Sequence, residues 1–164
     1  MPIKVGDKLP DAEFIIKTKD GLAKLSIEDI TKGRKIVLFA VPGAFTPTCH
    51  RNHLPGFLEN LGAIKEMGVD EVAVIAPNDV HVVDAWAKDT KGDGKILFLA
   101  DGNADFAKAI GMDIDLSNAG MGLRTKRYSM IVEDGRVTSF NSGDVPGQAT
   151  ISSAATILEQ LRDQ

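Results

Sequence analysis

The sequence predicts an α/β fold in which helices flank a mixed central sheet. Three continuous apolar runs have the composition of buried strands and cover 36–41, 71–76 and 96–100. Segments with a helical spacing of apolar residues separate them, which is typical of parallel strands joined by helices. Two later apolar segments, 128–133 and 136–140, flank Asp134-Gly135, a dipeptide that favours a tight hairpin.

Each element follows from a local pattern, beginning with the strand 36–41. A helix is expected from 47 to about 67, because apolar residues recur there at helical spacing and Gly68 ends the pattern. Pro55 lies inside this helix and predicts a bend, since proline lacks the backbone N–H. The strand 71–76 follows.

In the second half of the chain, Asn78 or Asp79 is expected to cap a helix that passes through Trp86. A short helix over 104–110 follows the strand 96–100.

The hairpin comes next, and then a final helix that Ser152 should cap and that buries Ile157, Leu158 and Leu161. This order of strands and helices is that of the thioredoxin-like fold. Open α/β sheets place their sites at the carboxyl ends of their strands, and Cys49 follows the end of the strand 36–41.

Length and charge bound the class of protein. The 164 residues fit one domain over 1–164 with a sizeable core. The net charge of −4 does not suggest nucleic acid or an anionic membrane as a partner. No apolar run approaches the length of a membrane span.

Localisation is expected to be cytoplasmic. No apolar segment follows Met1-Pro2-Ile3-Lys4, so a signal peptide is not expected. The single cysteine excludes an internal disulfide and fits a reducing compartment. An organelle reached with a removable transit peptide is the alternative.

Cys49, the only cysteine, has surroundings that favour reactivity. Thr46 can act as N-cap and Pro47 fits the first helical position, which makes Cys49 the third helical residue. Backbone N–H groups and the helix dipole favour a thiolate there, and the thiolate is the nucleophile. A lone cysteine is more often a small buried apolar residue, but the neighbours Thr48, His50 and others are polar or cationic.

The segment from Thr46 to Cys49 looks like a redox C-x-x-C motif in which threonine replaces the first cysteine. With one sulfur, the chain cannot close its own disulfide, which favours a peroxide-reducing thiol over a disulfide exchanger. The thiolate would attack a peroxide oxygen and become a sulfenic acid. Donors must stabilise the leaving oxygen, and the Thr46 hydroxyl can donate and accept.

The spacing of Pro42, Thr46 and Cys49 matches the peroxiredoxin signature. Two longer segments resemble the type II, peroxiredoxin-five-like subgroup: Pro42-Gly43-Ala44-Phe45-Thr46-Pro47-Thr48-Cys49 and His53-Leu54-Pro55-Gly56-Phe57. The similarity runs from about Ile3 to the last helix. The resemblance implies that Cys49 is the peroxidatic residue, that Pro42 shields it, and that Thr46 hydrogen-bonds sulfur and peroxide. It also implies that the N–H groups of Thr48 and Cys49 face the substrate.

The family also uses a distant arginine, and the segment 123–130 resembles the one that carries it. Arg127 matches that arginine, whose guanidinium would favour the Cys49 thiolate and orient the peroxide. Without the resemblance, Arg124, Lys126 and Arg127 would be read as a solvated basic patch. Arg124 is a candidate for a supporting role.

The two histidines that follow Cys49 have different expected roles. His53 is expected to line the site or to hydrogen-bond within it, and His50 and Arg51 to be mostly exposed. Three scattered histidines and one cysteine show no metal-ligand spacing, so no metal is expected, and the resemblance implies no cofactor.

Many type II members carry a resolving cysteine, which would fall near Val74 or Thr150; neither position holds sulfur here. The resemblance therefore implies a one-cysteine cycle, in which glutathione with glutaredoxin, or thioredoxin as second candidate, reduces the sulfenate. Hydrogen peroxide and small organic hydroperoxides are the expected substrates, with peroxynitrite as an alternative.

The family often forms dimers through the face near the site, so a homodimer is expected with Phe45 and 77–79 as contacts. A monothiol disulfide oxidoreductase and a redox sensor or holdase are the rival functions.

Overall fold

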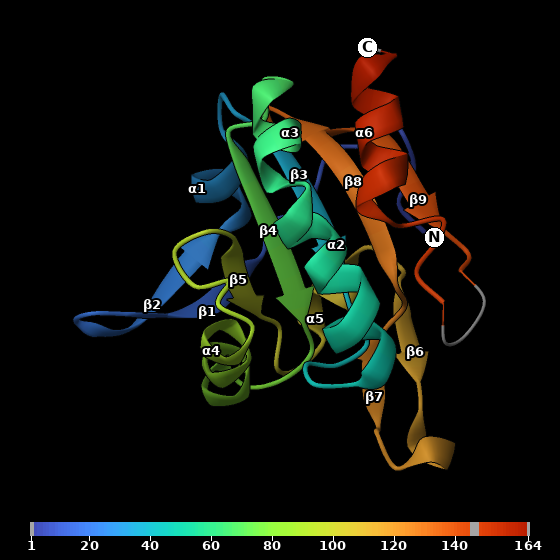
Figure 1. The fold of residues 1–164 in the computed structure, drawn as a ribbon. Coiled ribbons are helices and arrows are strands. Elements are labelled where there is room, and N and C mark those ends of the chain that lie inside the picture. Colours follow the sequence, from blue (N-terminus) through green and yellow to red (C-terminus); the bar gives the residue numbers. More distant parts are fainter. Residues whose placement is uncertain (1, 145–147, 164) are drawn as a thin grey trace.

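The computed structural model describes residues 2–144 and 148–163. Within these residues, seven strands form one mixed sheet in the order β2-β1-β5-β4-β3-β8-β9 (Figure 1). Their bounds are β1 Glu13–Thr18, β2 Gly21–Ser26, β3 Lys35–Ala40, β4 Glu71–Ala76, β5 Leu97–Ala100, β8 Tyr128–Glu133 and β9 Arg136–Ser142. A smaller sheet pairs β6, Asp113–Asp115, with β7, Leu123–Thr125.

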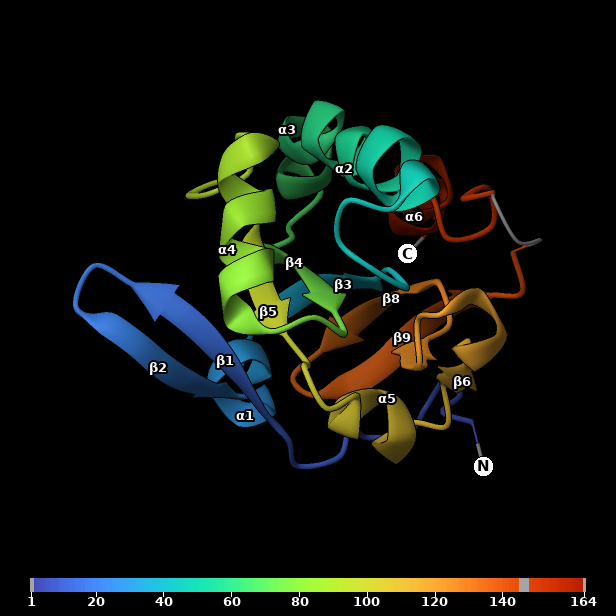
Figure 2. The same cartoon turned by 90° about the horizontal axis from the view of Figure 1, so that it is seen from below.

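Helices cover both faces of the large sheet, as the sequence predicted (Figure 2). One face carries α2 Leu54–Glu59, α3 Leu61–Glu66, α4 Val80–Asp89 and α6 Ala154–Arg162; the other carries α1 Ile27–Thr31 and α5 Asp105–Ala109. In β3, Val37 and Phe39 pack into the first layer, whereas Ile36 and Leu38 pack into the second. Because both faces are covered, the run reads as continuously apolar.

The position of β3 determines which distant residues meet. It pairs in parallel with β4, and in antiparallel fashion with β8, where Ala40 lies opposite Tyr128. The carboxyl end of β3 therefore lies beside the beginning of β8. This arrangement brings the loop before Cys49 next to Arg127.

The predicted hairpin is confirmed. Asp134 and Gly135 have φ angles of 48° and 81°, the positive values that a type I′ turn requires. Glu133 pairs with Arg136 across the turn, and β9 continues beyond the predicted end to Ser142.

The predicted helix over 47–67 is wrong as a single α-helix. A π-helix covers Cys49–His53, and α2 and α3 follow with a break at Asn60. The N–H of Leu54 donates to the carbonyl of Cys49, five residues back. Pro55, the second residue of α2, cannot donate to a carbonyl of the preceding turn, and the wider turn falls directly before it.

One predicted helix cap is wrong and another is confirmed. Ser153, rather than Ser152, caps α6 and accepts a hydrogen bond from Thr156 N at 3.3 Å. Of the two candidates for α4, Asp79 is the cap, and its side chain accepts from two backbone N–H groups. No helix in the described part of the chain has the length and apolar character needed to cross a membrane.

Candidate active site

The loop between β3 and the π-helix is tied to the end of β4. The N–H of Val41 donates to the carbonyl of Ile75 at 3.0 Å, and that of Ala44 to Oδ1 of Asn78 at 2.9 Å. Within the loop, the Thr46 hydroxyl donates to the carbonyl of Gly43 at 2.6 Å. Hydrogen bonds to a buried strand and to its own backbone thus fix the loop that leads to Cys49.

Cys49 lies where the sequence predicted, in the first turn of the helix that begins at Pro47. The N–H of His50 donates to the carbonyl of Thr46 at 2.8 Å and so closes that first turn. Cys49 is fully buried. Direct contact of this sulfur with a large reactant therefore requires the segment to move.

Arg127 contacts both Cys49 and His53. Its Nη2 donates to Sγ of Cys49 at 3.0 Å, and its Nη1 lies 2.8 Å from Nδ1 of His53. The two nitrogens of one planar guanidinium therefore hold two groups from one turn of the π-helix. A cation at this distance from sulfur stabilises a thiolate, and its fork fixes orientation.

The contacts of His53 determine its tautomer. Arginine has only donors, so Nδ1 of His53 must be the acceptor. Nε2 lies 2.9 Å from the carbonyl of Ser152, which can only accept, so the hydrogen is on Nε2. Burial, together with the charge of Arg127, lowers the pKa of His53 from 6.5 to about 4. His53 is therefore neutral near neutral pH.

Aromatic rings provide the apolar surroundings of His53. Its ring lies 5.0 Å from that of Phe39 and 5.6 Å from that of Phe57. Phe39 and Phe57 stack on each other with centroids 4.0 Å apart. This packing removes water from the imidazole and limits the orientations it can adopt.

Arg124 contacts the loop rather than the sulfur. Its Nη1 donates to the carbonyl of Pro42 at 3.2 Å and its Nε to the carbonyl of Met121 at 2.8 Å. A Cβ on Gly43 would lie 2.7 Å from Nη1 of Arg124, so only glycine leaves room for this contact. Arg124 therefore supports the backbone that precedes Thr46.

His50 is half-buried, which corrects the expectation that it is mostly exposed; Arg51 is exposed as expected. The indole N–H of Trp86 donates to Nδ1 of His50 at 3.1 Å, and the ring of Phe45 stacks on His50 at 5.6 Å. A residue next to Cys49 is thereby connected to α4. The sequence gives no signal for this pair, because 36 positions separate its members.

The structure thus places the residues that the sequence singled out in one region, some in direct contact with Cys49 and others in the loop before it. Cys49, His53 and Arg127 are in direct contact, and Pro42 and Thr46 belong to the fixed loop. Thr48 immediately precedes Cys49. Phe45 has a positive φ of 63° and is 46% exposed.

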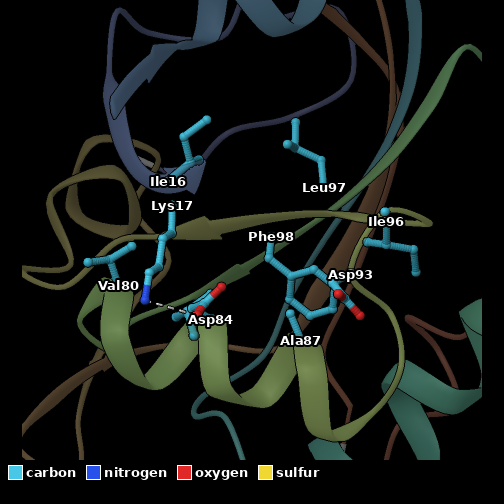
Figure 3. A pocket seen from close by; sticks show the side chains of 11 residues that line it. Ile16, Lys17, Val80, Asp84, Ala87, Asp93, Ile96, Leu97 and Phe98 are labelled. Atoms are coloured by element: carbon cyan, nitrogen blue, oxygen red, sulfur yellow. Dashed lines mark ion pairs between the residues drawn. The ribbon is translucent and has the colours of Figure 1, made fainter. Parts of the chain in front are cut away.

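Other candidate sites are weaker. A surface pocket lies between α4 and the strands β1 and β5. Lys17 Nζ lies 3.5 Å from Oδ2 of Asp84 there, and Figure 3 shows the two side chains facing each other. Neither Cys49 nor Arg127 lines it. Among the described residues, no cluster of three or more His, Cys, Asp or Glu side chains is placed to hold a metal ion.

Comparisons with known proteins indicate the family of the chain. The redoxin family model matches residues 4–158. Peroxiredoxin-2C of Oryza sativa subsp. japonica is 41% identical over 161 residues, which cover 98% of this chain and 99% of the relative. Peroxiredoxin-2B of Arabidopsis thaliana is 38% identical, with the same coverage.

Solved structures give the same result. Reduced Prx3 of Vibrio vulnificus in complex with H2O2 superposes with a TM-score of 0.92 at 42% identity, covering 97% of this chain and 99% of that one. The Plasmodium falciparum antioxidant protein, a 1-Cys peroxiredoxin, superposes with a TM-score of 0.91 at 28% identity, covering 99% and 100%. The fold is the thioredoxin-like fold that the element order predicted. The chain belongs to the redoxin family, within which it is a peroxiredoxin of type II with a single cysteine.

Proposed function

We propose that this thiol peroxidase reduces hydrogen peroxide and small organic hydroperoxides at Cys49 and is regenerated by glutathione with glutaredoxin. The observation that carries the assignment of the site is the contact of 3.0 Å from Arg127 Nη2 to the sulfur of the only cysteine in the chain. Thioredoxin is the second candidate reductant.

In the first step, the Cys49 thiolate attacks the nearer oxygen of the peroxide. The S–O bond forms as the O–O bond breaks, sulfur is oxidised to sulfenic acid, and the leaving oxygen takes a proton to become water or an alcohol. Arg127 stabilises the negative charge that moves from sulfur to oxygen. Thr46, at the start of the helical turn, is the proposed second contact of the peroxide.

In the second step, an external thiol must act, because the chain has no other cysteine. One glutathione thiolate attacks the sulfenate sulfur and forms a mixed disulfide, with release of water. A glutaredoxin thiolate then attacks the glutathione sulfur of that disulfide and releases the Cys49 thiolate, and a second glutathione frees the glutaredoxin thiol as glutathione disulfide leaves. The complete burial of Cys49 requires the π-helix to open for this step.

The first experiment mixes reduced protein with one equivalent of hydrogen peroxide in a stopped-flow instrument while Trp86 fluorescence is recorded and sulfenate is trapped. We expect a fast second-order reaction that Cys49→Ser abolishes and Arg127→Ala slows strongly. A rate no higher than that of a free thiol would refute the peroxidase and favour monothiol disulfide exchange.

Steady-state peroxide consumption, measured with each reductant in turn, then tests which reductant regenerates Cys49. Peroxide consumption should be sustained by glutathione with glutaredoxin and be slower with thioredoxin and its reductase. The opposite order would leave the peroxidase intact and overturn the proposed reductant.

The proposal extends to a homodimer formed near the site. Its support is the exposure of large apolar side chains in this part of the chain, Phe45 at 46% and Ile151 at 44%. Sedimentation at micromolar concentration tests it, and a monomer would contradict it.

A further inference from the structure

A carboxylate on the far side of His53 organises the backbone that His53 contacts. Oδ1 of Asp144 accepts from the N–H groups of Thr150 and Ile151 at 2.9 and 2.6 Å. Its Oδ2 accepts from the N–H of Ser152 at 3.1 Å and from the hydroxyl of the same serine. One side chain thus satisfies four donors in three consecutive residues.

The same three residues precede α6. The N–H of Ser153 donates to the carbonyl of Thr150, and Ser152 is fully buried. With its N–H and hydroxyl held by Asp144, Ser152 directs its carbonyl at Nε2 of His53, 2.9 Å away. Burial raises the pKa of Asp144, but the hydrogen bonds from Ser152, Ile151 and Thr150 outweigh it and lower the pKa below its usual value. Asp144 is therefore an ionised acceptor at neutral pH.

We propose that Asp144 is a positioning residue for the peroxide step, because it fixes the Ser152 carbonyl that orients His53 and, through His53, the guanidinium of Arg127 on Cys49. This inference rests on the proposed peroxidase activity. The chain of contacts is continuous from the Asp144 carboxylate to the Cys49 sulfur. Without Asp144, the Ser152 backbone loses its anchor, His53 gains freedom to rotate, and the fork of Arg127 is no longer held.

The test is a double-mutant cycle on the rate of sulfenate formation with hydrogen peroxide. Asp144→Ala should slow the reaction by roughly tenfold to a hundredfold, the scale of a small misplacement of a reacting group. In an Arg127→Ala background, Asp144→Ala should have no further effect, since the two residues act in series. Ser152→Ala, which removes only the hydroxyl contact, should give a smaller loss in the same direction.

Alkylation of Cys49 with iodoacetamide distinguishes a misplaced Arg127 from a general loosening of the structure around the sulfur. A merely structural role would expose the buried sulfur and speed alkylation. Under the proposal, the peroxide rate falls while the alkylation rate does not rise. Asp29→Asn is the matched control: Asp29 also accepts from a serine N–H, but it lies in α1 on the opposite face of the sheet.

An Asp144→Ala rate equal to that of the unmodified protein, or an equal loss with and without Arg127, would overturn the proposal. If Asp144→Ala does not fold, Ser152→Ala and its cycle with Arg127→Ala decide the question. A slow reaction of the unmodified protein would instead refute the peroxidase, so the two failures are distinguishable.

Discussion

Arg127 donates to Nδ1 of His53 across 2.8 Å, and this hydrogen bond exists only while His53 is neutral. The apolar rings around the imidazole and the neighbouring guanidinium charge both keep a proton off it. The folded pKa of about 4 lies below the ordinary value of 6.5. Because the folded protein keeps His53 neutral, acid favours the unfolded chain. The stability of the protein is therefore linked to the same hydrogen bond that orients Arg127.

The protein is predicted to lose stability between pH 7 and pH 5. The unfolded chain takes up a proton on His53 near pH 6.5 whereas the folded chain does not until about pH 4, so stability falls as the pH is lowered through this window. The expected loss from His53 is about 2 kcal/mol. Urea unfolding at the two pH values measures it. His53→Gln should remove most of the dependence; an equal loss in that variant would contradict the assignment.

Arg127→Lys is predicted to slow the peroxide step strongly although the positive charge is kept. One ammonium cannot reproduce the planar fork that holds Sγ of Cys49 and Nδ1 of His53 together. Loss of one such donor typically costs about 10²–10³ in rate. Rapid mixing with hydrogen peroxide gives the number. A rate within twofold of the original would mean that charge alone is sufficient.

Gly43→Ala is predicted to impair the site without unfolding the protein. The new Cβ would come within 2.7 Å of Arg124 Nη1 and 3.1 Å of Thr46 Cγ2, so the arginine must leave the Pro42 carbonyl and the threonine must shift. We expect a peroxide rate reduced by roughly tenfold. Gly62→Ala in α3 serves as control, because its Cβ meets no atom within 4 Å and alanine favours helix. Equal peroxide rates in the two variants would argue against the loop contact.

Trp86 is predicted to report the opening of the π-helix. Its indole donates to His50, and the reductant can reach the buried Cys49 only if this segment moves. Trp86 emission should therefore change when the sulfenate reacts with glutathione and return on reduction. In His50→Leu, the indole has lost this partner beforehand, so the change should be much smaller. A constant spectrum throughout the cycle would show that the reductant enters without breaking this contact.

The buried strands and the chemistry of the first helical turn could be predicted from the sequence because each depends on a short run of residues. Continuous apolar runs marked β3 and β4, and the spacing of Thr46, Pro47 and Cys49 marked the turn. The hairpin β1–β2 was missed, since it lies at the edge of the sheet and Phe14 is its only fully buried residue.

What could not be predicted depends on backbone atoms and on distant pairs. The acceptor for His53 is the carbonyl of Ser152, a group that every residue carries, and it lies 99 positions away. The π-helix likewise depends on tertiary packing, because the first helical turn and the turn that holds Pro55 must both pack on the same face of the sheet. The side chain of Ser152 suggested a cap, but the structure uses its neighbour for that purpose and Ser152 itself for the site.

Because of the π-helix, the number of residues from Cys49 to His53 matters more than their identity. A π turn holds one residue more than an α turn, so removing one residue there would restore an ordinary α-helix while the segments before and after it kept nearly their present register. With α2 held on the sheet through Leu54 and Phe57, the change would be confined to the turn itself, where Cys49 and His53 would stand three residues apart instead of the four at which Arg127 now contacts both. Straightening this helix, or grafting its straightened form onto another scaffold, would therefore alter the spacing at the reactive centre while the fold around it stays the same.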